Sequence, residues 1–166
     1  LFFTLLETLL LYYGDMDSFD ALCHSMATLS TGGFSTRTGS LGAFSNYSQV
    51  VVCVFMVLAG CNFSLVLLSL TRKSLTILKN QEFRCFLLYV LFTGVVIGLV
   101  LLFGLHHSLG GSFREAFFTV ISTMTTTGFF VGDYTLWPSF LWVILFLLMF
   151  IRSRSEERRV GKECRS

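Results

Sequence analysis

Charged side chains are scarce in this sequence of 166 residues, and the scarcity sets its class. Only 13% of the residues are charged against 54% that are hydrophobic, and the mean hydropathy is +0.73. No charged residue lies between Arg37 and Arg72, or between Arg84 and Arg114. Because a helix that crosses a bilayer needs about 20 apolar residues, both runs are long enough to span one. The composition excludes a soluble domain and predicts an all-α polytopic membrane protein.

A basic surplus is also lacking once the C-terminal end is set apart. The formal net charge is +2, but residues 152–166 hold six of the twelve Lys and Arg and three of the ten acidic residues. The body therefore keeps six basic and seven acidic residues, a net charge of −1, which excludes a nucleic-acid-binding protein. Residues 152–166 carry no apolar periodicity. We expect them to be non-native, vector-derived sequence; the alternative is a basic cytoplasmic tail.

The motifs of enzymes and of metal or disulfide frameworks are missing too. The five cysteines are odd in number and form no C-x-x-C pair, and three lie in or beside apolar runs, where Cys acts as a small hydrophobic residue. No H-E-x-x-H motif and no nucleophile with a partner occurs. An intramembrane enzyme that uses Glu7, Cys23 or His24 is therefore disfavoured, and we expect neither an enzyme nor a cofactor.

What the sequence does contain is one short pattern written twice. Ser30-Thr31-Gly32-Gly33-Phe34 and Thr126-Thr127-Gly128-Phe129-Phe130 are hydroxyl-rich runs that lead into glycine. Aligning Gly32 with Gly128, at an offset of 96 residues, also pairs Thr31 with Thr127 and Phe34 with Phe130. Each run follows a segment of about a dozen residues, Phe19–Leu29 or Phe113–Met124, which is too short to span a membrane and predicts a re-entrant half-helix.

Longer apolar segments flank these half-helices. We expect membrane helices over Leu1–Tyr13, Val50–Leu70, Phe86–Leu105 and from Leu141 to Ile151. Residues 71–84 are the most basic part of the body, so the positive-inside rule predicts a cytoplasmic loop there. Both half-helices then enter from the outer side. The chain divides into a pore unit at 1–70, the loop at 71–84, a second pore unit at 85–151 and the tail at 152–166.

Backbone carbonyls explain why Thr-Gly runs would interrupt apolar helices. Carbonyl oxygens can replace the water that a potassium ion loses on entering a membrane, and glycine lets successive carbonyls point one way. The C-terminal end of each half-helix adds a partial negative charge of roughly half a unit. We therefore predict an ion-selectivity filter that binds K⁺ through the backbone of Thr31, Gly32, Gly33, Thr127, Gly128 and Phe129.

Single polar residues in apolar surroundings leave two interpretations open. Glu7 either faces a protein groove or water and is merely tolerated, or lines the ion path. Asn62 and Gly60 either pack and hydrogen-bond between helices or contact the ion. Arg37 is expected to be a solvated loop charge, with an electrostatic role near the filter as the alternative. His24 is expected to be packed or hydrogen-bonded rather than a ligand.

The strings SFDALCHSMATLSTGGFSTRTGSLG, FMVLAGCNFSL and REAFFTVISTMTTTGFFVGDYTLWP resemble the Trk/Ktr/HKT superfamily of cation-uptake proteins, most closely its bacterial Trk-type potassium membrane subunits. The resemblance covers Leu1–Ile151. It implies four M1-P-M2 units (helix, re-entrant pore helix and filter, helix) around one potassium-channel-like pore. This chain then holds the second unit, from partway through M1, and the third, up to the middle of M2, so we expect a fragment.

The same resemblance implies potassium uptake across the bacterial inner membrane, contact with membrane lipid, a homodimer and a cytosolic nucleotide-binding regulatory subunit. Glycine at both filter positions resembles the potassium-selective members, because some sodium-conducting relatives have serine at one of them. Two alternatives stay open. One is a sodium or mixed monovalent cation transporter of the same fold, and the other is a non-conducting membrane assembly subunit.

Overall fold

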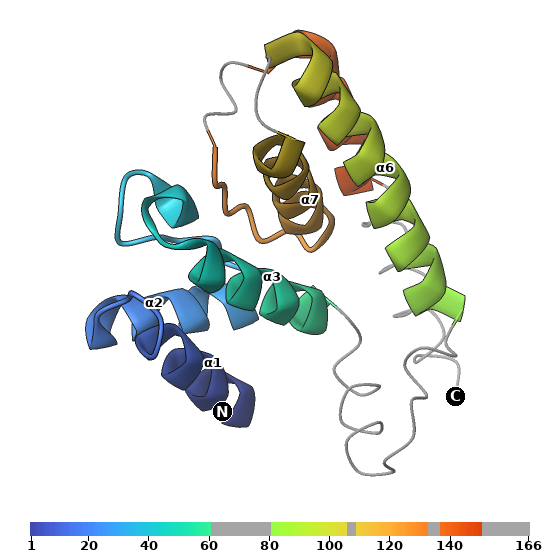
Figure 1. Ribbon diagram of the computed structural model, residues 1–166. Coiled ribbons are helices and arrows are strands. Elements are labelled where there is room, and N and C mark those ends of the chain that lie inside the picture. The colour runs from blue at the N-terminus through green and yellow to red at the C-terminus, as the bar shows by residue number, and fades with distance from the viewer. Residues whose placement is uncertain (61–80, 106–108, 133–136, 151–166) are drawn as a thin grey trace, which may run out of the picture.

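The computed structural model describes residues 1–60, 81–105, 109–132 and 137–150 (Figure 1). Within these residues the chain forms helices and no strand. The elements are α1 (Phe2–Tyr12), α2 (Ser18–Leu29), the short 3-10 helix η1 (Ser40–Ala43), α3 (Asn46–Gly60), α6 (Gln81–Leu105), α7 (Leu109–Met124) and a C-terminal helix over Ser139–Phe150. The all-helical part of the predicted fold is confirmed for the described residues.

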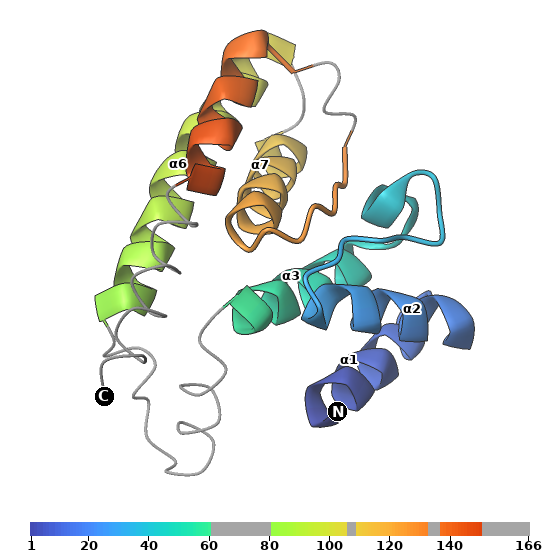
Figure 2. The ribbon, with the colours of Figure 1, turned by 180° about the vertical axis from the view of Figure 1, so that it is seen from behind.

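The helices form two halves that meet at α3 and α7. In the first half, residues 1–60, α1 packs along α2, and α3 contacts both of them. In the second half, residues 81–150, α6 packs along α7, and the C-terminal helix lies beside α6 (Figures 1 and 2). Helix α3 also contacts α7. Phe118 and Phe129 of the second half belong to the hydrophobic core of the first, so the two halves share a packed interface.

The outer faces of the long helices are apolar. On α6 the exposed side chains include Leu88, Leu91, Phe92 and Phe103. The stretch Phe83–Phe103 is the one described helix that is both long and apolar enough to cross a bilayer, and α1, α3 and Ser139–Phe150 are shorter apolar helices. Exposed apolar area on this scale is typical of a surface covered by lipid or by another protein rather than by water.

Helices α2 and α7 are too short to cross a bilayer, as the sequence predicts for both. With 12 and 16 residues they extend roughly 18 and 24 Å, against a hydrocarbon core of about 30 Å. Helix α2 matches its expected segment to within one residue, whereas α7 is already helical at Leu109, the first described residue after 106–108 and four residues before the expected Phe113. Gly110 and Gly111 therefore lie within α7 instead of preceding it.

Helices α6 and α3 reach beyond the expected bounds. Helix α6 is already formed at Gln81, within the predicted loop 71–84, and the residues directly before it lie outside the described ones. Helix α3 begins at Asn46, four residues before Val50. The remainder of the span predicted up to Leu70 lies outside the described residues.

The early start of α3 has a local cause in Asp15. Its carboxylate accepts hydrogen bonds from the Ser45 backbone N–H at 2.6 Å, from the Ser45 hydroxyl at 2.8 Å and from the Ser48 hydroxyl. An anion at this position satisfies free N–H groups and suits the positive end of α3. Burial opposes ionisation of Asp15, but the bonds from Ser48 and Ser45 outweigh it and hold its pKa below the ordinary value.

Two glycines set the distance between α6 and α7. A Cβ placed on Gly94 would lie 2.6 Å from the Phe117 ring, and one on Gly98 would lie 2.8 Å from the Phe113 ring. The two phenylalanine rings stack on each other with centroids 6.5 Å apart. Small residues four apart let membrane helices approach closely, and here they make room for rings instead of for a backbone.

Replacing Gly94 by Ile should therefore separate α6 from α7. Overpacking a close contact costs about 1–3 kcal/mol, and in a chain of this size roughly 2–4 °C of melting temperature follows each kcal/mol. We expect the detergent-solubilised chain to melt several degrees lower than the unaltered one. The matched control is Gly110→Ala, where a Cβ meets nothing within 4 Å. Equal melting temperatures for the two variants would contradict the packing described here.

Candidate functional site: two repeated helix ends

Helices α2 and α7 end in the same way. After α2, the Gly32 N–H donates to the Ala27 carbonyl at 2.8 Å and the Thr31 N–H to the Thr28 carbonyl at 3.1 Å. After α7, the Thr127 N–H donates to Ser122 at 2.9 Å and the Thr126 N–H to Thr123 at 3.1 Å. Both patterns are the Schellman arrangement, which satisfies the last helical carbonyls and requires a left-handed residue just beyond the helix.

Threonine occupies that left-handed position in both halves. Thr31 has φ +52° and Thr126 has φ +58°, although a β-branched residue rarely adopts this conformation. Each hydroxyl donates to the carbonyl just before it, at 2.8 Å and 2.7 Å. A second left-handed residue follows two positions later, Gly33 at φ +66° and Gly128 at φ +89°. Glycine adopts this conformation at little steric cost, whereas the strain in each threonine is about 1–3 kcal/mol, and such strain is concentrated at functional sites.

These geometries correct the alignment of the two repeats. Thr31 corresponds to Thr126 and Gly33 to Gly128, an offset of 95 residues rather than 96. Gly32 therefore pairs with Thr127, and Phe34 with Phe129. The sequence held a signal for this register in two further identities, Ala21 with Ala116 and Thr28 with Thr123. Thr126 is the site residue that the 96-residue alignment leaves out.

We call residues 30–36 the first loop and residues 125–131 the second loop, and the two loops touch. A Cβ placed on Gly33 would overlap the Thr127 carbonyl oxygen and lie 3.3 Å from the Gly128 carbonyl carbon. Gly33 thus lies directly against the backbone of the second loop. A Cβ on Gly128, by contrast, would meet nothing within 4 Å. The C-terminal ends of α2 and α7 converge at this contact, with open space beside Gly128.

The segment around η1 supports the second loop from behind. The Leu41 N–H donates to the Phe130 carbonyl at 3.1 Å, and the Phe130 N–H donates to the Ser40 hydroxyl at 3.4 Å. Gly42 lies against Val131, where a Cβ would overlap the Val131 carbonyl oxygen. Gly60, at the end of α3, packs on Thr125 in the same loop, as the packing interpretation of Gly60 predicts. Main-chain contacts from the first half therefore fix the second loop.

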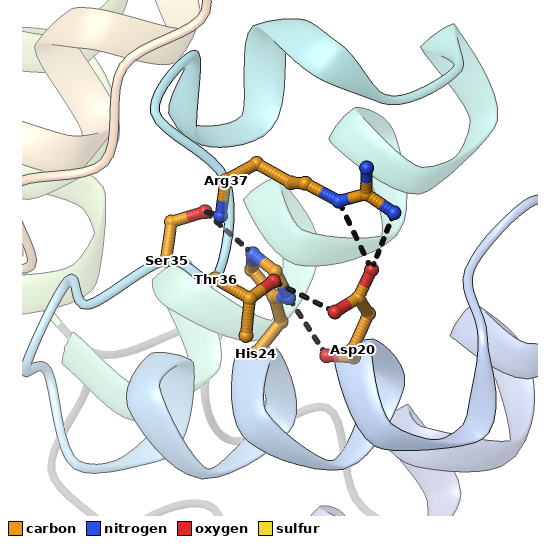
Figure 3. A network of polar contacts seen from close by, with 5 residues as sticks. All are labelled: Asp20, His24, Ser35, Thr36 and Arg37. Carbon is orange, nitrogen blue, oxygen red and sulfur yellow. Dashed lines mark hydrogen bonds and ion pairs between the residues drawn. The ribbon is translucent and has the colours of Figure 1, made fainter.

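A polar network holds the end of the first loop to α2 (Figure 3). Asp20 accepts a hydrogen bond from the Thr36 hydroxyl at 2.8 Å and from two Arg37 nitrogens at 3.3 Å. The bond from Thr36 and the charge of Arg37 hold the pKa of Asp20 below its ordinary value. Arg37 is more than half exposed, as expected of a solvated loop charge, and it is also paired with Asp20, which the sequence did not predict.

The second half has a counterpart of the Asp20 network at the same repeat positions. Glu115 corresponds to Asp20, and its carboxylate lies against Gly132, which corresponds to Arg37. The Glu115 carboxylate also accepts a hydrogen bond from the Trp137 indole N–H at 3.1 Å. An acid on each of the two helices therefore secures the chain beyond the loop. In the first half it does so by an ion pair, and in the second half by a hydrogen bond from Trp137 and by packing against Gly132.

Three further polar residues singled out in the sequence have different surroundings. Glu7, on α1, is fully buried, and both carboxylate oxygens lack a hydrogen-bond partner among the described residues. Asn62 lies outside those residues. His24 is fully buried with both ring nitrogens in hydrogen bonds, as its packed interpretation predicts. In the described part of the chain no group of three or more His, Cys, Asp or Glu residues could hold a metal ion.

Comparisons with known proteins show which family the chain resembles. A family described as "Cation transport protein" matches residues 7–155. The chain is 40% identical over 147 residues to the Trk system potassium uptake protein TrkH of Escherichia coli and 39% identical over 141 residues to TrkG of the same organism. The alignments cover 86% and 81% of this chain, but only 30% and 28% of those two relatives.

A solved structure shares the fold. The crystal structure of the potassium transporter TrkH from Vibrio parahaemolyticus superposes with a TM-score of 0.82 at 31% sequence identity. The match covers 88% of this chain and 32% of the Vibrio chain, so the present sequence spans about a third of the length of its relatives. With a family match over nearly its whole length, the chain belongs to the TrkH family of cation transport proteins.

Proposed function

We propose that this chain forms two neighbouring walls of a potassium-conducting pore in a multi-pass membrane transporter, and that further walls come from sequence outside it. The observation that carries the proposal is the repeated helix end, a left-handed threonine and a left-handed glycine, at which the two loops meet. The relatives named as potassium uptake proteins support potassium as the ion. The bacterial inner membrane is the location that such uptake requires.

The backbone of the two loops supplies the ligands in this proposal. Carbonyl oxygens of residues 31–33 and 126–129 replace the water around K⁺ without bringing a formal charge into the membrane. Helices α2 and α7 direct their C-terminal ends, each roughly half a negative charge, at the same place. A membrane potential then drives the ion inward with about 2.3 kcal/mol per 100 mV. The homodimer and the regulatory subunit stay predictions of the family resemblance.

The test is made in the full-length transporter, meaning the longer polypeptide of which we propose this chain is part. A strain without its own potassium uptake systems is complemented, and the uptake of K⁺ and of Na⁺ is measured. In Gly128→Ser the serine has room for its side chain, but its backbone would have to adopt φ +89°. This strain is about 1.4 kcal/mol or more, and a free-energy difference of that size changes the ratio of K⁺ to Na⁺ binding at least tenfold. We expect the preference for K⁺ over Na⁺ to fall by about that factor.

The matched control is Gly110→Ser, which also faces open space but lies in α7 without a left-handed backbone. It should keep the unaltered preference. An unchanged preference in Gly128→Ser would exclude the second loop from the filter. Equal uptake of K⁺ and Na⁺ by the unaltered protein would favour the mixed-cation alternative. Absence of uptake despite normal amounts in the membrane would favour a non-conducting assembly subunit.

A further inference from the structure

His24 lies where α2, the first loop and the second loop come together. It occupies the middle of α2, and its side chain is fully buried. Its ring contacts residues of both halves of the chain. These residues belong to the two loops that form the proposed ion path, so the side chain can act on that path through the loops.

One edge of the imidazole holds the first loop (Figure 3). The Nδ1 atom lies 2.7 Å from the Asp20 carbonyl, which can only accept, so Nδ1 carries the proton and donates. The Nε2 atom lies 2.9 Å from the Ser35 hydroxyl, two residues after Gly33. That hydroxyl also accepts a bond from the Arg37 N–H at 3.2 Å, which leaves its own proton free to be donated to Nε2. A neutral ring therefore satisfies every partner.

The face of the same imidazole holds the second loop. Phe129, directly after Gly128, stacks on it with ring centroids 6.0 Å apart and planes 28° from parallel. Phe129 is only 2% exposed, so this stack belongs to the packed interior. Phe44 also contacts the imidazole, edge-on, with ring centroids 5.1 Å apart. The ring thus lies between Ser35 of one loop and Phe129 of the other.

The second half has no equivalent device. At the offset of 95 residues, His24 corresponds to Thr119 and Ser35 to Phe130, so neither the ring nor the hydroxyl is repeated. The contact is therefore specific to the boundary between the two loops described here and is not a packing motif that every repeat needs. Its partners stand two residues after Gly33 and one residue after Gly128, where a small displacement would move the left-handed glycines themselves.

We propose that His24 is a positioning residue that fixes the two loops relative to each other and so determines how well the filter distinguishes K⁺ from Na⁺. The inference rests on the proposed function of the loops. Different substitutions can remove the hydrogen bond to Ser35 and the stack on Phe129 one at a time. His24→Phe keeps an aromatic ring against Phe129 but loses both hydrogen bonds, whereas His24→Gln keeps a group that can reach Ser35 but loses the stack. Ser35→Ala removes only the link to the first loop.

The experiment uses the full-length transporter and measures two quantities, the amount of protein in the membrane and the ratio of K⁺ to Na⁺ uptake. We expect His24→Phe and Ser35→Ala each to lower the ratio by about tenfold, the effect of losing one buried hydrogen-bonding partner. We expect the ratio in His24→Gln to lie between those of His24→Phe and the unaltered protein. The double variant His24→Phe with Ser35→Ala should lower it no further than either single change, because both remove the same link.

Thr119→Val, at the matching position of the second half, is the control and should keep the unaltered ratio. If His24→Phe lowers the amount of protein but leaves the ratio unchanged, His24 is only a packed core residue and the inference is wrong. The inference would also be wrong if the double variant lowered the ratio of K⁺ to Na⁺ uptake by the product of the two single effects. Failure of the proposed function is a separate outcome, because Gly128→Ser would then leave the ratio unchanged as well.

Discussion

Replacing Gly33 by alanine should abolish potassium uptake, whereas replacing its neighbour Gly32 should be tolerated. The Gly33 backbone is left-handed at φ +66°, and its missing Cβ would overlap the Thr127 carbonyl oxygen. An alanine there forces the two loops apart by roughly 1 Å, because non-bonded atoms cannot approach much closer than van der Waals contact. A displacement of about that size can cost 10²-fold in a site that depends on orientation.

Gly32 is the matched control for this prediction. A Cβ at Gly32 would lie 3.2 Å from the Ser30 hydroxyl and 3.3 Å from the Phe34 ring, both of them side-chain atoms that can move aside. We expect Gly32→Ala to keep most of the uptake in the complementation assay, with equal amounts of both variants in the membrane. Loss of uptake in Gly32→Ala alone would restore the 96-residue alignment and contradict the register found in the structure.

Gly42→Ala should have the second-largest effect, through the contact between η1 and the second loop. A Cβ at Gly42 would overlap the Val131 carbonyl oxygen, which is a backbone atom with little freedom to move. The Leu41 N–H bond to Phe130 would lengthen as the segments separate, and the buried Leu41 side chain would lose its packing. A cost of about 2 kcal/mol corresponds to roughly 4–8 °C of melting temperature in a chain of this size.

The measurement is the melting temperature of the purified chain in detergent, followed by potassium uptake in the full-length transporter. Gly39→Ala serves as the control, since a Cβ there would lie 3.6 Å from Ala43, an ordinary contact. We expect normal melting and uptake for Gly39→Ala and a clear loss of both for Gly42→Ala. A Gly42→Ala protein with the unaltered melting temperature would show that η1 does not brace the second loop.

The helices could be predicted from the sequence because long apolar runs indicate helices in apolar surroundings and polar interruptions indicate where they end. The short α2 and α7 stood out, since a run of a dozen residues cannot cross a bilayer. Exact starts could not be predicted, because they depend on partners far away in the sequence. Helix α3 begins early owing to Asp15, some thirty residues before it, whose carboxylate accepts hydrogen bonds from Ser45 just before α3 and from Ser48 in its first turn.

The loops were recognisable from Thr and Gly, but their register was harder to predict. Gly32 and Gly33 are adjacent, so either of them can be aligned with Gly128. The identities of Ala21 with Ala116 and of Thr28 with Thr123 favour the 95-residue offset, and the backbone angles establish it. The links that connect the loops are long-range and chemically mixed. Neither Ser35 to His24 nor His24 to Phe129 follows from a spacing rule, because each joins residues brought together by the packing of α2 against the second half.

The unequal exposure of two equivalent phenylalanines has a consequence for symmetry. Phe129 is 2% exposed against the helix of the preceding half, whereas Phe34, at the same repeat position, is 81% exposed. The contact is heterologous, because Phe129 of the second half packs on His24 of the first half and Phe34 is not buried in return. The position equivalent to His24 in the second half is Thr119, so a further contact of this kind would use different side chains. Heterologous contacts generate either a closed ring or an open series, depending on the rotation between the units.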